Sequence, residues 1–197
     1  PVDVKWKALD LFPGDVIYEY YAATEGGGTT IFGDEWLTHP GSVGKAWSYS
    51  VVKILDDNGE EVPRGESGQV YMEMKGSSFE YYKDKEKTQK ARVGNMFTTG
   101  DIGYMDDEGY LYLLDRKNDM IISGGENVYP REVELTLLAH PAVADCSVFG
   151  VPHDYWGEAV KAAVVLAPGS SATPRELADW CRTQIAAYKR PRFVEFM

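Results

Sequence analysis

Short apolar runs separated by turn sequences fill most of the chain up to residue 114. The runs that fit β-strands are residues 16–21, 51–55, 70–74, 102–105 and 110–114. Residues 16–21 are apolar or aromatic almost throughout and predict a buried strand, whereas 70–74 alternate as a half-buried strand does. The turn sequences at 56–59 and 106–109 end in glycine and predict hairpins. The region from about residue 40 to 114 is therefore expected to be mostly antiparallel strands.

Three segments carry helix signals, one before residue 100 and two after it. Residues 81–91 are polar, rich in lysine, and predict an exposed helix. Pro130 occupies the first position of a helix expected over 131–138. Thr173 and Glu176 form a capping box that begins another helix.

A strand pair, residues 143–151 and 159–166, is expected between the last two helices. The order helix, two strands, helix is typical of a small α+β layer. We therefore predict an α+β fold in which a mostly antiparallel β part, residues 1–117, precedes a small α+β domain, residues 118–197.

Composition and charge limit the possible partners. The chain carries 31 acidic against 20 basic residues, a formal net charge of −11, which argues against nucleic acid or an anionic membrane as its main partner. The apolar run at 162–167 is too short to span a bilayer, so no transmembrane segment is expected. Cys146 and Cys181 lack metal-ligand and redox spacing and predict buried thiols in a reducing cytoplasm. The sequence leaves the oligomeric state undetermined.

Four motifs occur in order along the chain. They are YYAATE at 20–25, PGSVGKAW at 40–47, TTGD at 98–101 and DRKNDMIISGGENVYPREVE at 115–134. Each is weak alone, but together, over nearly the whole chain, they resemble the adenylate-forming acyl-CoA synthetases (AMP-dependent synthetases and ligases). The resemblance implies an acid–thiol ligase that uses ATP and Mg²⁺ to convert a carboxylic acid, possible substrates including fatty acids, to acyl-AMP. Coenzyme A then accepts the acyl group as a thioester.

The resemblance also implies roles for residues of the first and third motifs. Tyr21 is expected to lie against the adenine ring, Thr24 to donate its hydroxyl to a phosphate, and Glu25 to bind Mg²⁺, which prefers carboxylate and phosphate oxygens. Asp101 is expected to accept hydrogen bonds from the ribose hydroxyls. The structural alternatives are a core aromatic residue for Tyr21 and a turn aspartate for Asp101.

The fourth motif supplies the remaining candidates. Arg116 matches an arginine that contacts ribose and phosphate, and a surface salt bridge is its alternative. Gly124 and Gly125 match a loop that lines the pantetheine tunnel, although glycines suit any tight turn. Asn118 matches the hinge about which the small C-terminal domain rotates between the two half-reactions, and its alternative is a polar turn residue.

Two elements of the resembled family have no counterpart in the sequence. They are an upstream Ser/Thr- and Gly-rich loop ending in lysine and a lysine near the C-terminus, both of which handle phosphate charge. We therefore expect residues 1–117 to be the C-terminal part of the large domain and 118–197 a truncated mobile domain, in a fragment that is inactive by itself. Two alternatives stay open: an adenylation domain that loads a carrier protein, or, for the isolated chain, a non-catalytic nucleotide-binding module.

Overall fold

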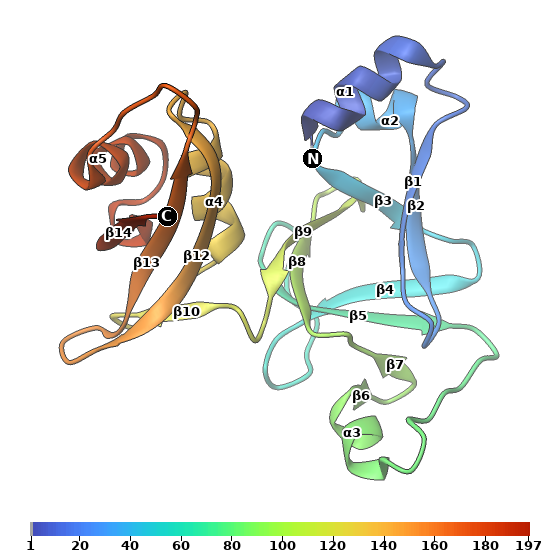
Figure 1. Cartoon of the computed structure of the whole chain (residues 1–197). Coiled ribbons are helices and arrows are strands. Elements are labelled where there is room, and N and C mark those ends of the chain that lie inside the picture. The colour runs from blue at the N-terminus through green and yellow to red at the C-terminus, as the bar shows by residue number, and fades with distance from the viewer. Residues whose placement is uncertain (1) are drawn as a thin grey trace. The chain divides into compact units, whose positions relative to one another are not determined.

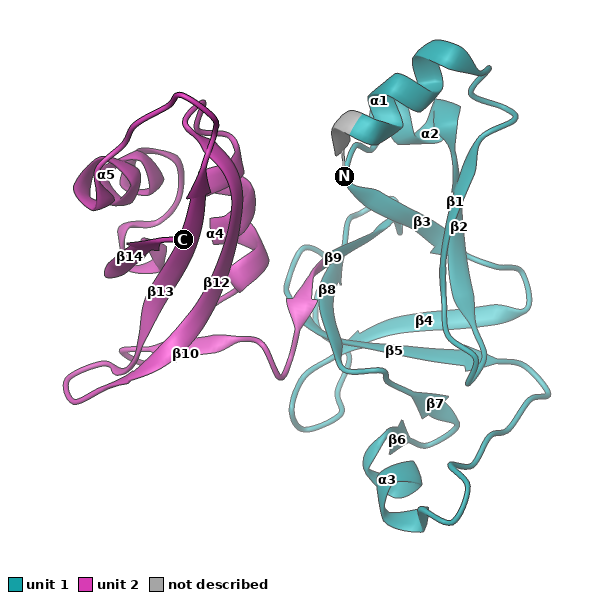
Figure 2. Cartoon of the chain, viewed as in Figure 1, with its two compact units in different colours: residues 1–113 teal, residues 114–197 magenta. Residues whose placement is uncertain are grey.

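The computed structural model describes residues 2–197, with side chains from residue 4 onward (Figure 1). The chain divides after Leu113 into two compact units, each with its own hydrophobic core (Figure 2). The first is built mainly of antiparallel strands, and the second combines a small mixed sheet with helices. The predicted α+β fold class is therefore confirmed. The boundary after residue 117 concerns the domains of an enzyme and stays a prediction.

The strands of the first unit form one sheet in the order β1-β2-β3-β9-β8-β5-β7-β6, with β4 paired to β5. Their bounds are β1 Tyr18–Ala22, β2 Gly28–Phe32, β3 Ser42–Ala46, β4 Ser50–Leu55, β5 Gly68–Met74, β6 Arg92–Val93, β7 Met96–Phe97, β8 Asp101–Met105 and β9 Leu111–Arg116. Helices α1 (Val2–Leu11), α2 (Gly33–Thr38) and α3 (Lys85–Lys90) belong to the same unit.

Strand β5 lies in the interior of this sheet, between β4, β7 and β8. The consecutive residues Val70, Tyr71 and Met72 are all buried. Successive side chains of a strand point to opposite faces, so both faces of β5 are covered here. The predicted half-buried alternation over 70–74 is therefore wrong, although the strand itself is confirmed.

Two other predictions need correction. Strand β1 ends the sheet order, and its Tyr18 and Tyr20 are 60% and 65% exposed, so the strand predicted to be buried is largely solvent-facing. The exposed helix predicted over 81–91 is shorter, because Asp84 caps α3 by accepting a hydrogen bond from the Lys87 N–H. Thr88 faces inward from that helix and is buried.

The hairpin between β8 and β9 forms as predicted. The Gly109 N–H donates to the Asp106 carbonyl, and the Asp106 N–H donates to the Tyr110 carbonyl. Gly109 has a φ of +85°, a conformation that glycine adopts without steric cost. The turn at 56–59 also forms. The segment after this turn pairs with β4 only through an isolated bridge between Leu55 and Glu61, and β4 pairs along its whole length with β5 instead.

The sheet of the second unit has the order β11-β10-β13-β12, with β14 pairing in parallel to β13. The bounds are β10 Ile121–Ser123, β11 Glu126–Val128, β12 Val143–His153, β13 Gly157–Leu166, β14 Phe193–Phe196, α4 Pro130–Leu138, α5 Pro174–Gln184 and the 3₁₀ helix η1 Ala187–Lys189. Thr173 and Glu176 form the predicted capping box. Leu137 of α4 and Leu177 of α5 share one core with Val160 and Val164, so both helices cover the same face of β13.

The cysteines belong to the same core region. Cys181 is fully buried and Cys146 is half-buried, and neither forms a disulfide. Burial raises the pKa of the Cys181 thiol to about 11, and burial together with the charges of Glu134 and Asp145 raises the pKa of Cys146 to about 12. Both groups are therefore neutral thiols at physiological pH.

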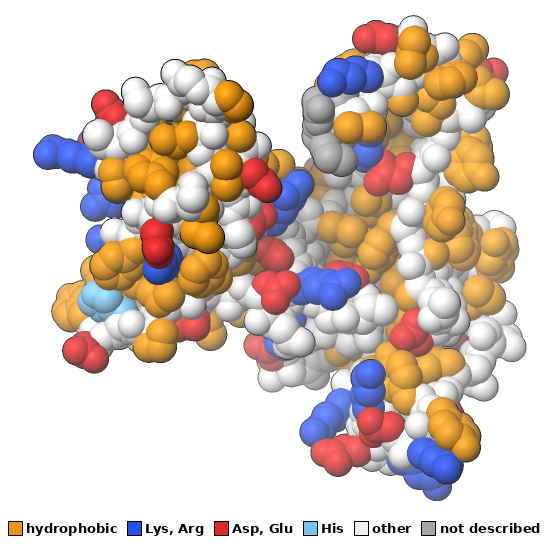
Figure 3. Space-filling model, viewed as in Figure 1, with side chains coloured by type: hydrophobic (Ala, Val, Ile, Leu, Met, Phe, Trp, Pro, Cys, Tyr) orange, Lys and Arg blue, Asp and Glu red, His pale blue; other side chains and the backbone are white. Residues whose placement is uncertain are grey.

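Figure 3 shows acidic and basic side chains interspersed on the face it displays. Among residues 2–197, no helix is long and apolar enough to cross a membrane.

Candidate functional site

Tyr21 at the end of β1 and Asp101 at the start of β8 meet in the first unit. The Tyr21 hydroxyl donates a 2.6 Å hydrogen bond to Oδ2 of Asp101. The Thr99 hydroxyl donates to the same carboxylate oxygen, also at 2.6 Å. Two motif residues that are eighty positions apart in the sequence are thus brought into direct contact. A carboxylate held by these hydroxyls has a fixed orientation, as a group that binds ribose hydroxyls requires.

A tight turn follows Tyr21 and places the next two candidates. The Gly26 N–H donates to the Ala23 carbonyl, and Gly26 and Gly27 have φ values of +115° and +86°. A Cβ on Gly27 would lie only 3.0 Å from the Cβ of Met72 and from Oγ of Ser50. Glycine is required there because the turn packs directly on the sheet. Thr24 and Glu25 are the two central residues of the turn that this hydrogen bond closes.

Glu25 is held by two hydroxyl groups. The Thr24 hydroxyl donates to Oε2 at 3.0 Å, and the Tyr81 hydroxyl donates to Oε1 at 2.7 Å. Burial acts to raise the pKa of Glu25, but the hydrogen bonds from Tyr81 and Thr24 and the charge of Lys87 together lower it below its ordinary value. The hydrogen bond between Tyr81 and Glu25 also raises the pKa of the Tyr81 phenol. Glu25 is therefore an ionised carboxylate at neutral pH.

Tyr81 belongs to none of the four sequence motifs and had no predicted role. This residue lies at the start of the predicted helix 81–91, whereas in the structure it precedes α3. The alternation of Phe79 and Tyr81 just ahead of the polar segment is the signal that indicates an extended, inward-facing stretch there.

Glu25 can be compared with the carboxylates that bind Mg²⁺ in nucleotide sites. Mg²⁺ in nucleotide sites is held by one or two carboxylates and by substrate phosphates, and it keeps several waters. Among the side chains of residues 4–197, no group of three or more His, Cys, Asp or Glu is placed to hold a metal ion. Glu25 could therefore serve as a single protein ligand beside nucleotide phosphates, but not as part of a closed protein cage.

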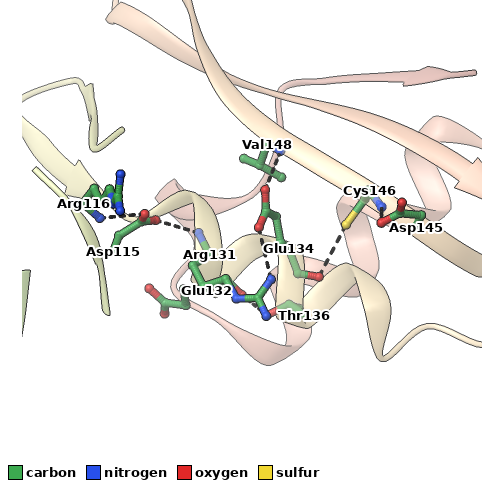
Figure 4. Close-up of polar contacts among 9 residues, drawn as sticks. All are labelled: Asp115, Arg116, Arg131, Glu132, Glu134, Thr136, Asp145, Cys146 and Val148. Carbon is green, nitrogen blue, oxygen red and sulfur yellow. Dashed lines mark hydrogen bonds and ion pairs between the residues drawn. The ribbon is translucent and has the colours of Figure 1, made fainter. Parts of the chain in front are cut away.

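The second unit holds the candidates of the fourth motif. Arg116 ends β9, a strand that starts in the first unit and continues past Leu113 into the second. The Arg116 side chain is exposed, and its carbonyl accepts the Asp119 N–H across a turn that contains Asn118. Asp115, which sequence reasoning passed over, accepts the Arg116 N–H through Oδ1 and the Arg131 N–H through Oδ2, both at 2.8 Å (Figure 4). Arg131 lies in the first turn of α4.

Asp115 caps helix α4 from a distance of sixteen residues. The N-cap residue of α4, Tyr129, makes no side-chain capping bond. The first N–H groups of a helix lack intrahelical partners and carry partial positive charge, so the Asp115 carboxylate satisfies a donor and complements the helix dipole. This hydrogen bond attaches the start of segment 115–118, which contains Arg116 and Asn118, to the start of α4.

Gly124 and Gly125 form the turn between β10 and β11, with φ values of +64° and +87°. The Gly124 N–H donates to the Trp156 carbonyl at 2.8 Å, and a Cβ on Gly124 would lie 2.7 Å from Cε3 of the Trp156 ring. Around Gly125 the position of a Cβ is open. Glu158, a residue with no role predicted from the sequence, accepts the Ile122 N–H at 2.9 Å and fixes β10 beside β13.

Comparisons with known proteins agree with these motifs. The family model described as AMP-binding enzyme matches residues 1–82, and that of the AMP-binding enzyme C-terminal domain matches residues 132–197. The long-chain-fatty-acid–CoA ligase FadD13 of Mycobacterium tuberculosis is 41% identical over 182 residues, which are 91% of this chain and 36% of the relative.

Two solved structures have a similar fold. The o-succinylbenzoate CoA synthetase MenE of Bacillus subtilis, in complex with its acyl-adenylate intermediate, matches with a TM-score of 0.88 and 33% identity, over 100% of this chain and 40% of that one. The amide bond synthetase McbA of Marinactinospora thermotolerans matches with a TM-score of 0.84 and 36% identity, over 94% and 39%.

The chain spans between 36% and 40% of the length of these three proteins. The segments matched by the two family models contain the Tyr21–Glu25 loop at one end of the chain and, at the other, most of helix α4 together with β12, β13, α5 and β14. Ordered motifs, matching family models and matching folds lead to one assignment: the chain belongs to the AMP-binding, adenylate-forming enzyme family.

Proposed function

We propose that the longer protein containing this chain is an acid–thiol ligase. It would activate a carboxylic acid with ATP to acyl-AMP and then pass the acyl group to coenzyme A. The observation that carries the proposal is the arrangement of Tyr21, Asp101 and Glu25 in the first unit, where two oriented carboxylates belong to the loop and strand expected to hold a nucleotide. The named activity of FadD13 supports the overall reaction.

Each candidate residue has a task in that reaction. Attack of a carboxylate on the α-phosphate, with release of pyrophosphate, depends mainly on positioning and charge neutralisation. Asp101 would accept the ribose hydroxyls, Tyr21 would lie against adenine, and Thr24 would donate to a phosphate. Glu25 would bind the Mg²⁺ that accompanies ATP.

The second unit would serve nucleotide and thiol in turn. Arg116 would contact ribose and phosphate, and Asn118 would be the hinge of a mobile domain formed by residues 118–197. Gly124 and Gly125 would line the path of the pantetheine arm, where the absence of side chains leaves room for a thin substrate. Residues 1–117 would be the end of the large domain.

The acid is best sought among hydrophobic acids, since FadD13 is named for long-chain fatty acids. MenE is named for o-succinylbenzoate, so aromatic and dicarboxylic acids belong in the same panel. A second candidate reaction keeps the adenylation step and changes the acceptor to a carrier protein or an amine. The match to the amide bond synthetase McbA favours testing it.

The experiment is ATP–pyrophosphate exchange by the longer protein across this panel, followed by transfer from acyl-AMP to coenzyme A, a carrier protein or an amine. We expect acid-dependent exchange and a thioester of coenzyme A. Asp101→Ala should raise KM for ATP far more than it lowers the melting temperature. Absence of exchange with every acid would exclude the ligase, and an Asp101→Ala protein that only melts earlier would exclude the nucleotide role of Asp101.

The 197-residue chain alone should catalyse ATP–pyrophosphate exchange no faster than the background rate. Its residues include neither the glycine-rich lysine loop nor the late lysine of the resembled family, and we expect each of these to stabilise the transition state by several kcal/mol. Robust exchange by the chain alone would contradict this expectation.

A further inference from the structure

The Tyr81 hydroxyl contacts the Glu25 side chain from a distant part of the sequence. This hydroxyl lies 2.7 Å from Oε1 of Glu25, although 56 residues separate them. Glu25 sits in a loop beside glycines with positive φ, a place where local structure alone leaves a long carboxylate side chain free to choose among rotamers. A distant donor removes that freedom.

The Tyr81 ring is itself held firmly in place. Phe79 packs edge-on against it with 5.3 Å between ring centroids, and Phe79 in turn packs on Phe97, a residue of the buried core, at 5.2 Å. Nζ of Lys87 lies 4.4 Å from the Tyr81 ring centroid, within cation–π range. The phenol is thus fixed between the core of the sheet and helix α3.

The backbone of Tyr81 is anchored to α3 as well. Its N–H donates to Oγ1 of Thr88 at 2.9 Å, and the Thr88 hydroxyl donates to the Asp84 carbonyl at 2.8 Å. Thr88 is buried, so these bonds are shielded from water. Helix α3 therefore determines where the Tyr81 hydroxyl lies and, through it, where the Glu25 carboxylate lies.

The two hydroxyl donors leave Glu25 able to bind a cation. Thr24 occupies one lone-pair site on Oε2 and Tyr81 one on Oε1, whereas an ionised carboxylate offers about four such sites. Carboxylates that ligate metals are commonly oriented by hydrogen bonds of this kind from residues that do not touch the metal.

We propose that Tyr81 is a positioning residue, which holds the Glu25 carboxylate in the orientation that binds the Mg²⁺ of Mg·ATP. The proposal rests on the proposed function, in which Glu25 is the protein ligand of that ion. It assigns a role to the segment between β5 and α3, which none of the four sequence motifs includes.

The test compares Tyr81→Phe with Tyr82→Phe in the longer protein. Phenylalanine keeps the ring and its packing and removes only the hydroxyl. Tyr82 is the matched control, because it is adjacent in sequence and 86% exposed. Binding of Mn²⁺, used as a paramagnetic substitute for Mg²⁺, is measured by electron paramagnetic resonance in the presence of ATP and without acid, so that no turnover occurs. The Mg²⁺ dependence and the KM for ATP in pyrophosphate exchange are measured alongside.

Tyr81→Phe should weaken Mn²⁺ binding and raise the Mg²⁺ requirement about tenfold or more, the range found for residues that orient metal ligands, while the protein remains fully folded at the assay temperature. Tyr82→Phe should behave as wild type. In Glu25→Gln, which lacks the ligand, adding Tyr81→Phe should cause no further loss.

The outcomes separate the two proposals. If Glu25→Gln weakens Mn²⁺ binding but Tyr81→Phe does not, the positioning role is wrong and the proposed function stands. If Glu25→Gln changes neither binding nor exchange, the metal role of Glu25 fails and the inference about Tyr81 fails with it. Equal effects of Tyr81→Phe and Tyr82→Phe would also overturn the inference.

Discussion

The Tyr21 hydroxyl and Oδ2 of Asp101 are 2.6 Å apart, a short hydrogen bond between a neutral phenol and a carboxylate. It joins the edge strand β1 to β8, which lies further into the sheet. Hydrogen bonds to charged groups contribute about 1.5–3 kcal/mol, more than neutral ones, so this contact helps to fix the loop that carries Thr24 and Glu25.

Tyr21→Phe should therefore lower the free energy of unfolding of the chain by about 1–2 kcal/mol. Urea denaturation of the 197-residue chain measures this. Tyr20→Phe is the matched control, since Tyr20 is the preceding residue and is 65% exposed. A Tyr21→Phe chain as stable as the Tyr20→Phe chain would show that the hydrogen bond adds nothing to stability.

The two thiols should respond to pH as buried groups do. The pKa values of Cys181 and Cys146 are raised to about 11 and 12, and a raised pKa means that folding favours the neutral thiol. The stability that this preference contributes is complete below the ordinary thiol pKa near 9 and is lost as pH rises through 11 to 12. At pH 8, iodoacetamide should label the folded chain far more slowly than the urea-unfolded chain. Equal labelling rates would contradict the burial of Cys181 and the partial burial of Cys146.

Gly124 and Gly125 offer a comparison between two neighbouring positions. Both have positive φ, which costs an L-residue about 1–2 kcal/mol. Gly124→Ala must also push its Cβ into the Trp156 ring at 2.7 Å, whereas the space around Gly125 is open. Gly124→Ala should therefore destabilise the chain by clearly more than Gly125→Ala, as measured by urea denaturation. The opposite order would mean that Trp156 moves aside without cost.

Much of this architecture could be predicted from sequence because its signals are local. The capping box at Thr173, the Pro130 helix start and the hairpin at 106–109 each depend on residues a few positions apart. Burial was less predictable, because the exposure of Tyr20 and the coverage of Val70 depend on where β1 and β5 lie in the sheet order. Periodicity within a strand carries no information about the neighbours of that strand.

The candidate site shows the same division. Its motif residues could be named from sequence, but the residues that orient them could not. Tyr81, Asp115 and Glu158 reach their partners across 56, 16 and 36 residues respectively, and side-chain contacts over such separations follow only from the folded chain. The sequence motifs name the residues expected to face a ligand, and the fold shows which groups hold such residues in place.

The capping of α4 by Asp115 can be tested by its effect on stability. The Asp115 carboxylate accepts the Arg131 N–H at the start of α4, so Asp115→Ala should cost about 1 kcal/mol, as the loss of an N-cap does. Asp115→Asn keeps an oxygen acceptor and should cost less. Asp119→Ala serves as a control, because Asp119 lies in the exposed turn of the same segment. Thermal denaturation of the three variants gives the order, and equal melting temperatures for Asp115→Ala and Asp119→Ala would show that Asp115 does not stabilise the helix.

The last prediction concerns Asn118 as the hinge between the two half-reactions. The residue is exposed, and it lies in the turn that the Asp119 N–H closes on the Arg116 carbonyl. A hinge must accept two backbone settings without strain, and asparagine tolerates unusual φ and ψ values better than most residues. Asn118→Pro fixes φ near −65° and restricts Lys117 as well, so in the longer protein it should lock one orientation of the mobile domain.

One half-reaction of that variant should then fall by orders of magnitude while the other changes little. Pyrophosphate exchange reports adenylation, and thioester formation from supplied acyl-AMP reports transfer to coenzyme A. The two must be measured separately, because a block in either one stops the overall reaction. Equal losses in both would mean that proline damages the fold, and full activity in both would place the hinge at another residue. Asn118→Gly, which widens rather than narrows the accessible backbone settings, should retain both half-reactions and so separates hinge restriction from the loss of the asparagine side chain.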